Sequence, residues 1–330
     1  MFWPPMNFRL PRLAPQLLTR RPCLSCISAP KGSRSGIGGV ASRIMTSVLT
    51  AGNERQARTI RTAACLVIGD EVLGGKTIDT NSAFMAKWCF SLGINLKRIE
   101  TIEDDEDEII EAVRRMSARY DFVVTSGGIG PTHDDITYRS IAKAFGLPLK
   151  LHAGAYERMK RLSKPHKSQP NFDWDVDSPA KTARLRMVEL PIDESRDLDK
   201  QVLFPQEEMW VPVSVVNENV HILPGVPKIF EGLLQGLKPL IIDRLEDPNG
   251  EGICRIIIST PLAESMAAAY LTELAAKVTP KGVKVGSYPR WGGNNSVTLV
   301  GRDRAYLESL VPEVLANVEG KRITTEELEG

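Results

Sequence analysis

The chain has 330 residues, of which 42% are hydrophobic and 25% charged, as is typical of a globular protein with a sizeable core. Its 42 lysines and arginines nearly balance 41 aspartates and glutamates, so the formal net charge is +1. This balance gives no support for broad binding to nucleic acid or to an anionic membrane surface. No apolar run in the sequence approaches the roughly 18 to 20 residues that a membrane-spanning helix needs. We therefore expect a small-molecule partner, with neither nucleic acid nor a membrane as ligand.

The first part of the chain is basic and contains no acidic residue before Glu54. Segments that are rich in arginine, contain serine and lack acids are typical of mitochondrial transit peptides, and no apolar core of the secretory type is present. We therefore expect residues 1–58 to be a leader that directs the protein to the mitochondrial matrix. Two alternatives stay open: a disordered basic leader without a targeting role, or a start of translation at Met45 that leaves the protein cytoplasmic.

The first predicted strand, residues 63–68, ends at a polar segment that begins with Gly69, Asp70 and Glu71. Apolar residues at helical spacing follow over 81–92, and a further strand is predicted over 96–102. An acidic run at 103–108 then precedes another apolar helical pattern. Acidic side chains in the first turn of a helix complement its dipole, so we interpret this run as a solvated helix N-terminus rather than a cation site.

Residues 121–137 (DFVVTSGGIGPTHDDIT) join an apolar run to a glycine-rich loop and two adjacent carboxylates. The glycines and the proline cannot continue the strand, so the chain must turn there. We expect Thr132 to be the N-cap, and Asp135 to lie in the first turn, of a helix that extends to Phe145. Glycine N–H groups at a helix N-terminus approach an anion closely, which predicts phosphate binding. The predicted ligand-binding residues of this loop are Ser126, Gly127, Gly128, Gly130, Pro131 and Thr132.

Strands that alternate with helices predict an α/β fold, a three-layer α/β/α domain with a mostly parallel sheet. The carboxyl ends of parallel strands meet at one edge, so we expect Asp70, Glu71 and the 126–135 loop to lie together. Strands at 211–216 and 220–223, joined by a hairpin turn, precede Pro224 and Gly225, which we expect to shape the backbone near the ligand. The predicted domains are an α/β domain at 59–246 with an insertion at about 164–209, a small α+β domain at 247–322 and a tail at 323–330.

Four segments resemble known proteins: GDEVLGGKTIDTN at 69–81, SGGIGPTHDDIT at 126–137, ILPGVP at 222–227 and VGSYPRWGGNNSVTL at 285–299. The first three together resemble the molybdopterin-binding-like domain of molybdenum-cofactor biosynthesis proteins of the MoaB/Mog type. Within that superfamily they are most similar to the CinA-like branch and to the N-terminal domain of animal FAD synthases. The fourth resembles the small domain that follows in the FAD synthase branch. FPQEEMWVPVSVV, before ILPGVP, departs from the bacterial CinA-like pattern P-x-G-T-A-P-G and is closer to the FAD synthases.

The resemblance implies a nucleotide or pterin ligand, because members of the superfamily bind molybdopterin or its adenylate. It also implies metal-dependent hydrolysis of a nucleotide pyrophosphate such as FAD or ADP-ribose, an activity associated with CinA-like and FAD-synthase-type domains. The predicted catalytic residues are Asp134 and Asp135, which would hold a divalent cation (Mg²⁺, Mn²⁺ or Co²⁺), and Asp70 or Glu71, which would complete its shell or accept a proton from water. Asn81 would contact the ligand. Homo-oligomers are common among relatives, so we expect one here.

Other interpretations stay open. A helix cap contributes about 1 kcal/mol, which alone accounts for Thr132 and Asp135 but leaves Asp134 unexplained. The domain could bind a pterin or flavin nucleotide without turnover, or it could adenylylate molybdopterin. We expect neither FAD synthesis nor nucleotide-amide hydrolysis, because the domains that carry those activities in relatives do not follow the small domain in this sequence.

Overall fold

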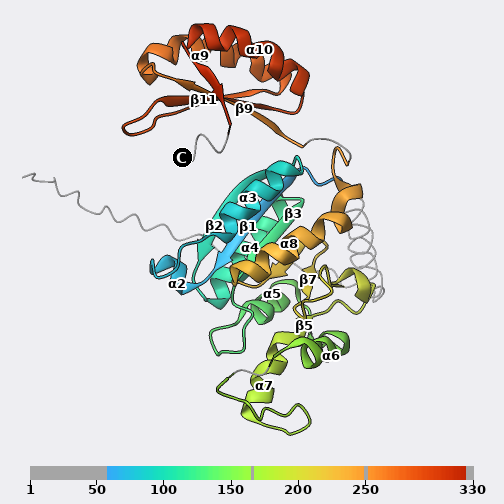
Figure 1. Cartoon of the computed structure of the whole chain (residues 1–330). Coiled ribbons are helices and arrows are strands. Elements are labelled where there is room, and N and C mark those ends of the chain that lie inside the picture. Colours follow the sequence, from blue (N-terminus) through green and yellow to red (C-terminus); the bar gives the residue numbers. More distant parts are fainter. Residues whose placement is uncertain (1–57, 165–166, 249–251, 325–330) are drawn as a thin grey trace, which may run out of the picture. The chain divides into compact units, whose positions relative to one another are not determined.

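The computed structural model describes residues 58–164, 167–248 and 252–324, so nearly all of the leader predicted for 1–58 lies outside the described residues. A six-stranded sheet in the order β2-β1-β3-β8-β7-β6 forms the centre of the first domain (Figure 1). The first four of these strands are parallel, and β7 runs antiparallel to both of its neighbours. The predicted α/β class with a mostly parallel sheet is confirmed. The strands are β1 (Thr62–Ile68), β2 (Asn95–Ile102), β3 (Phe122–Ser126), β6 (Val202–Leu203), β7 (Val213–Val216) and β8 (Val220–Leu223).

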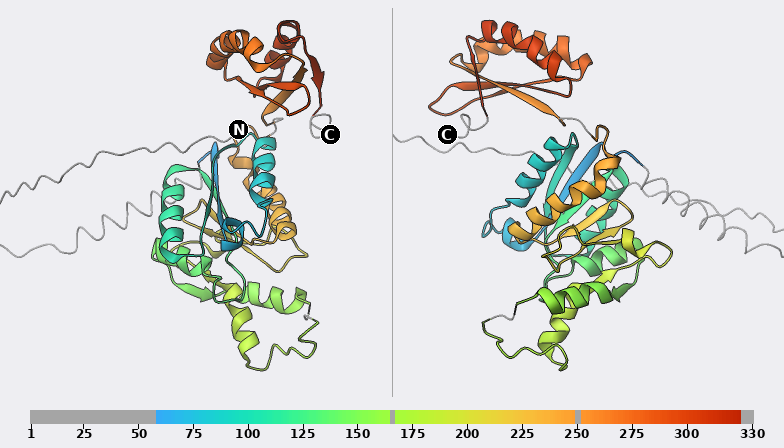
Figure 2. Two further views of the ribbon diagram at one scale, coloured as in Figure 1. Left: turned by 90° about the vertical axis from the view of Figure 1, so that its left-hand side faces the viewer. Right: turned by 45° about the vertical axis from the view of Figure 1, so that its right-hand side comes forward.

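Helices cover both faces of this sheet (Figure 2). α3 and α8 pack together on one face, and α4 and α5 pack together on the other. α4 begins where the Asp105 carboxylate accepts hydrogen bonds from the backbone N–H groups of Asp107 (2.9 Å) and Glu108 (3.1 Å). The acidic run therefore does contain a helix N-terminus. The polar segment after β1 forms the short helix α2. The helices are α2 (Asp70–Leu73), α3 (Asn81–Ser91), α4 (Glu106–Arg119), α5 (Thr137–Phe145) and α8 (Pro227–Ile241).

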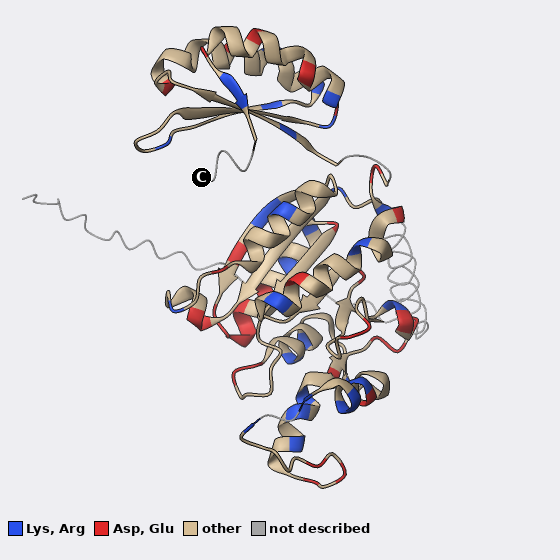
Figure 3. Ribbon diagram, in the orientation of Figure 1, with Lys and Arg blue, Asp and Glu red and all other residues tan. Residues whose placement is uncertain are grey.

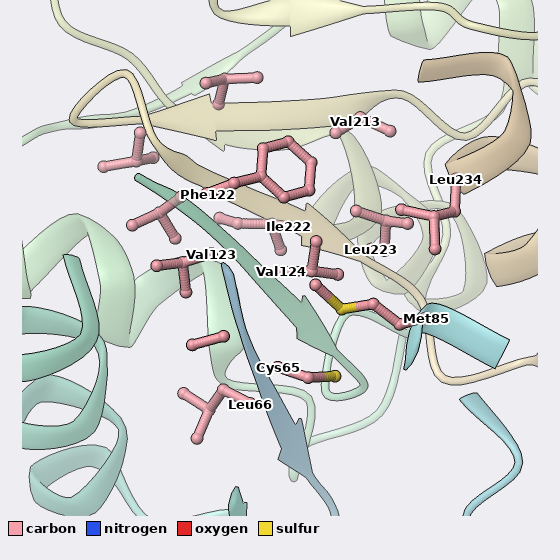
Figure 4. Packing of buried hydrophobic residues seen from close by; sticks show 14 of the residues in the cluster. Cys65, Leu66, Met85, Phe122, Val123, Val124, Val213, Ile222, Leu223 and Leu234 are labelled. Atoms are coloured by element: carbon pink, nitrogen blue, oxygen red, sulfur yellow. The ribbon is translucent and has the colours of Figure 1, made fainter. Parts of the chain in front are cut away.

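The central strands are apolar because helices cover both of their faces. All of β3 is buried, and so is β1 after its first residue. Figure 4 shows Phe122 and Val124 of β3 packed among side chains of β1 and β8, with Met85 of α3 and Leu234 of α8 closing the cluster. Each such side chain contributes about 1.5–3 kcal/mol by its burial. This core fixes the positions at which the parallel strands end.

The predicted hairpin between β7 and β8 is present. Residues 217–219 join Val216 to its partner Val220. Asn217 and Glu218 have φ angles of 48° and 66°, left-handed values that let the chain reverse within this short loop. The next residue, Asn219, donates hydrogen bonds from Nδ2 to the carbonyls of Ser117 and Tyr120, both at 2.8 Å. These bonds attach the hairpin to the end of α4.

The insertion predicted at about 164–209 contains regular structure of its own. β4 (Leu149–Leu151), just before α6 (Ala153–Leu162), pairs antiparallel with β5 (Glu189–Pro191), which also packs on α5. Between α6 and β5 lies α7 (Pro179–Leu185). Phe172 and Trp174 contact edge to face with ring centroids 4.8 Å apart, and the guanidinium of Arg184 lies 4.0 Å from the Phe172 centroid. The insertion is therefore folded around an aromatic cluster and joined to the sheet domain through β5.

Residues 254–323 form a four-stranded antiparallel sheet in the order β10-β11-β9-β12, with α9 and α10 on one face (Figure 1). Its core is formed by apolar residues of both helices and the three longer strands. β12 was not predicted, and its last residue, Ile323, lies in the predicted tail. Throughout the described ranges, no helix combines the length and apolar character needed to cross a membrane. The elements are β9 (Cys254–Thr260), α9 (Glu264–Val278), β10 (Lys284–Tyr288), β11 (Asn295–Gly301), α10 (Arg304–Asn317) and β12 (Lys321–Ile323).

One buried histidine should make the stability of this fold depend on pH. His221 of β8 lies against Phe122 with ring centroids 4.3 Å apart, and its burial lowers the imidazole pKa to about 3. A histidine in an unfolded chain has a pKa of about 6.5. As the pH falls, the unfolded chain therefore binds a proton first. The stability that the neutral imidazole contributes is complete above about pH 6.5 and is lost progressively as the pH falls toward 3.

We expect this group to lower the free energy of unfolding by about 1 kcal/mol between pH 7.0 and pH 5.5. Urea unfolding at both pH values would measure the difference for the wild type and for His221→Phe, which should lose that part of the pH dependence. His133→Gln is the control, because the side chain of His133 is 97% exposed. The assignment would be wrong if the wild type and His221→Phe lost equal stability on acidification.

Candidate functional site

The polar segments that were predicted to meet at one end of the sheet do so. The N–H of Gly127, after β3, donates to the carbonyl of Leu223 at the end of β8 (3.2 Å). The N–H of Gly69, after β1, donates to the carbonyl of Ile102 at the end of β2 (3.1 Å). Acidic residues gather at this end of the sheet, on α2 and at the start of α4 (Figure 3). We call the segments 69–71, 103–105, 126–135 and 224–225 together the carboxyl edge.

The glycines of the loop are required by close backbone packing. Gly127 has a φ of 113°, and a Cβ there would lie 2.1 Å from the carbonyl oxygen of Ile68 in β1. Gly128 has a φ of 64°, and its Cβ would lie 2.2 Å from Oγ1 of Thr137. A Cβ on Gly225 would lie 3.3 Å from the Cα of Gly127. The ends of β1, β3 and β8 therefore approach one another more closely than residues with side chains allow.

Asp135 organises the loop and does not cap the following helix. Its carboxylate accepts hydrogen bonds from the N–H of Gly130 (2.6 Å), the N–H of Thr132 (2.8 Å) and Oγ1 of Thr132 (2.5 Å). The prediction of Thr132 as a helix N-cap is wrong, because α5 begins only at Thr137. Thr137 Oγ1 instead donates back to the carbonyl of Gly127 (3.0 Å). The carboxylate of Asp135 is thus engaged within the loop.

Asp134, by contrast, points to solvent, with a side chain that is 62% exposed. The neighbouring Thr132 hydroxyl is the main reason that the Asp134 pKa is lowered, although in this structure that hydroxyl donates to Asp135. His133 Nδ1 lies 3.8 Å from Asp134 Oδ1. Asp134 is therefore an ionised, accessible carboxylate at neutral pH, as a metal ligand must be. Of the two predicted metal ligands, Asp134 is the accessible one.

The structure adds Asp104 to the site. Asp104 follows β2, and its carboxylate accepts a hydrogen bond from the Asp70 N–H (3.0 Å), while its own N–H donates to Asp70 Oδ1 (3.3 Å). Its pKa is raised, mainly by burial and further by the charges of Asp70, Glu71 and Asp134. A Cβ on Gly128 would lie 3.4 Å from Asp104 Oδ1, so this carboxylate faces the glycine loop. From the sequence, we interpret the run 103–108, which contains Asp104, as a solvated helix N-terminus. The carboxyl ends of parallel strands share an edge, and applying this rule to β2 could have identified Asp104.

Asn81, the first residue of α3, connects two parts of the carboxyl edge. Its Nδ2 donates to Oγ of Ser126 (2.9 Å) and to the carbonyl of Gly225 (2.8 Å). The residue is only 6% exposed, and within the described part of the chain its Oδ1 has no hydrogen-bond partner. Ser126 and Pro224 are buried at the same place. The predicted contact residues 81, 126 and 224–225 therefore lie together.

We expect Asn81→Ala to lower the free energy of unfolding by about 1–3 kcal/mol, because the hydroxyl of Ser126 and the carbonyl of Gly225 both lose a donor. Asn81→Asp should be at least as destabilising at neutral pH, since a carboxylate cannot donate to that carbonyl. Urea unfolding gives both values. Asn317→Ala is the matched control, because Asn317 donates only to a carbonyl within its own exposed helix (2.8 Å). An Asn81→Ala change no larger than this control would show that the two bonds are not structural.

A divalent cation fits the carboxylates of this edge only with help from a ligand. Within the described residues, no three or more His, Cys, Asp and Glu side chains are grouped so that they could hold a metal ion. Mg²⁺ in proteins is commonly held by one or two carboxylates together with phosphate oxygens and water. Asp134, together with Asp104 or Asp70, could supply these one or two carboxylates. Asp135 would contribute indirectly, because its hydrogen bonds hold the loop in position.

Comparison with known proteins places this chain in a known family. The family described as "Probable molybdopterin binding domain" matches residues 64–244, more than half of the 330-residue chain. A protein named "Probable FAD synthase" from Caenorhabditis elegans is 34% identical over 233 residues, which cover 69% of this chain and 44% of that protein. A protein of Aeropyrum pernix is 34% identical over 271 residues, which cover 80% of this chain and 93% of that protein.

Among solved structures, the CinA protein of Thermoplasma acidophilum is 30% identical with a TM-score of 0.45, covering 55% of this chain and 98% of that one. The chain spans less than half the length of the Caenorhabditis elegans relative named as an FAD synthase. The resemblance inferred from the sequence motifs is confirmed by the family match. This chain belongs to the molybdopterin-binding-domain family.

Proposed function

We propose that the domain hydrolyses a nucleotide pyrophosphate of the FAD or ADP-ribose type with the help of a divalent cation. The observation that carries the proposal is the meeting of Asp70 and Asp104, which hydrogen-bond to each other, with the Asp104 carboxylate facing the glycine loop. The nearby charges of Asp70, Glu71 and Asp134 also contribute to the raised pKa of Asp104. A phosphate group on the adjacent glycine loop would be repelled by these carboxylates unless a cation lay between them. Relatives named as FAD synthases direct attention to flavin and adenine dinucleotides as substrates.

The bound cation would neutralise phosphate charge and lower the pKa of water, with Asp134 and Asp70 as its protein ligands. The backbone N–H groups of Gly128 and Ile129, which make no hydrogen bond within the described residues, would orient the phosphate oxygens. Water attacks one phosphorus, the anhydride P–O bond breaks, and the departing monophosphate keeps the bonding electrons. The proton of the attacking water passes to a carboxylate. Asp104 suits that role, because a raised pKa brings a carboxylate nearer to neutrality.

A second candidate is a module that binds a pterin or flavin nucleotide without turnover. The absence of a ready group of metal-binding side chains in the described residues favours it. Both candidates require ligand binding at the carboxyl edge, so only a measurement of turnover separates them.

The test is incubation of the full chain with FAD, NADH and ADP-ribose in Mg²⁺, Mn²⁺, Co²⁺ or EDTA, followed by chromatography of the nucleotides. We expect metal-dependent release of mononucleotides from at least one substrate. Tight binding with every substrate left intact would reject hydrolysis and support the binding module. Transfer of AMP from ATP to added molybdopterin, with the dinucleotides untouched, would indicate an adenylyltransferase instead.

We further propose that residues 1–58 direct import into mitochondria and that the protein is a homo-oligomer. The basic, acid-free composition of the leader supports import. Fractionation of cells should then show a shortened form in the matrix, and a full-length form found only in the cytosol would contradict this. Light scattering after gel filtration tests assembly, and a mass of about one chain would exclude an oligomer.

A further inference from the structure

A cavity that was not predicted from the sequence lies beside the glycine loop. It has a volume of about 350 Å³. One wall is the loop at 129–135, the second is the first turn of α5, and the third is formed by Leu149 of β4 with Arg186 and Glu189 near and on β5. The cavity thus lies between the predicted phosphate-binding loop and the insertion. Cavities of roughly 300–1,000 Å³ are the usual size for small-molecule ligands.

Two charged side chains line this cavity without a partner in the described part of the chain. Arg186 is exposed and Glu189 half-buried, and neither side chain forms an ion pair or hydrogen bond with another described residue. Both side chains are therefore available to a ligand that enters the cavity.

The remaining lining gives the chemistry of that ligand. Ile136 and Leu149 present apolar surface, and the side chain of Leu149 is exposed although it is hydrophobic. An apolar wall with a guanidinium beside it suits a flat heteroaromatic ring, which packs on aliphatic side chains and attracts a cation to its face. Glu189 accepts hydrogen bonds only, so it suits ribose hydroxyls or ring N–H groups.

We propose that this cavity binds the nucleoside half of the nucleotide whose phosphates lie on the glycine loop. The inference rests on the proposed function for the position of the phosphates, and it adds the place where the nucleoside binds and the residues that recognise it. Leu149 and Ile136 contact the ring, Arg186 lies beside it, and Glu189 accepts hydrogen bonds from the sugar. The insertion therefore selects the substrate, while the carboxyl edge acts on it.

The test compares two probes that differ only in the nucleoside. α,β-Methylene-ADP and methylenediphosphonate share a phosphonate bridge that cannot be hydrolysed, so calorimetric titration with Mg²⁺ present measures binding to the full chain without turnover. We expect the wild type to bind α,β-methylene-ADP at least tenfold more tightly. Leu149→Asp and Arg186→Gln should each weaken that binding by about tenfold and leave the affinity for methylenediphosphonate unchanged.

Two control variants change exposed residues that do not line the cavity. Leu198→Asp changes an exposed leucine after β5, and Arg161→Gln changes an exposed arginine at the end of α6. Both should bind like the wild type, and all four variants should keep the wild-type melting temperature. Equal affinity of the wild type for the two probes, or equal weakening of both probes by Leu149→Asp, would overturn the proposal.

The outcomes also separate this proposal from the proposed function. Suppose that the wild type prefers α,β-methylene-ADP, that Leu149→Asp abolishes this preference, and that the protein cleaves no dinucleotide. The nucleoside cavity would then be supported and the hydrolase activity would be rejected. If the protein cleaves FAD or ADP-ribose but binds both probes equally, the hydrolase activity would be supported and the nucleoside cavity would be rejected.

Discussion

Gly127→Ala is expected to lower the free energy of unfolding by about 3 kcal/mol or more, the largest effect of any single methyl group at the carboxyl edge. The added Cβ would lie 2.1 Å from the carbonyl oxygen of Ile68, and that carbonyl belongs to the backbone of β1. Neither the strand nor the loop can move away without separating β1 from β3. Urea unfolding, together with ligand affinity for whatever folded protein remains, measures the effect.

Gly146→Ala is the control for this prediction. Gly146 also has a left-handed φ, 67°, but a Cβ there would have nothing within 4 Å. The substitution isolates the cost of left-handed backbone, about 1–2 kcal/mol. If Gly127→Ala cost no more than Gly146→Ala, the close approach of the strand ends would not be what requires glycine.

The second large effect is expected from the two adjacent aspartates, which should behave differently. Asp134→Asn should reduce kcat for pyrophosphate cleavage by about 100-fold or more while the melting temperature stays unchanged, because an exposed metal ligand is lost. Asp135→Asn should lower the stability by about 1–3 kcal/mol, because three hydrogen bonds to the loop are weakened. Asp247→Asn, at an exposed position away from the site, is the control for both.

Kinetics and thermal unfolding of the same preparations distinguish these roles. Loss of cleavage without loss of stability in Asp135→Asn would restore Asp135 as a metal ligand. Full activity in Asp134→Asn at saturating Mn²⁺ would remove Asp134 from the metal site.

Most of the sheet could be predicted from the sequence, because apolar runs and glycine-bounded loops are local signals. The helix start after the loop could not. The Thr132–Asp135 spacing indicates a capping turn, but the Asp135 side chain instead accepts hydrogen bonds from N–H groups that precede it, a local arrangement that competes with a helix. Spacing alone does not show in which direction such a side chain bonds.

Asp104 was missed because its role depends on a contact distant in sequence. The run 103–108 carries the charge pattern of a helix N-terminus, and Asp105 does cap α4. Only the parallel pairing of β2 with β1 brings Asp104 to Asp70. The cavity beside the loop depends in the same way on the pairing of β4 with β5 across the insertion. Long-range pairing is the information that periodicity in one sequence does not contain.

The most direct test of hydrolysis is to incubate the full chain with ADP-ribose and Mn²⁺ in water enriched in ¹⁸O, and to weigh the products by mass spectrometry. Hydrolysis predicts AMP and ribose 5-phosphate, with one ¹⁸O in the phosphate of just one of them, and no products in EDTA. Intact ADP-ribose with Mg²⁺, Mn²⁺ and Co²⁺ alike, together with intact FAD under the same conditions, would contradict it.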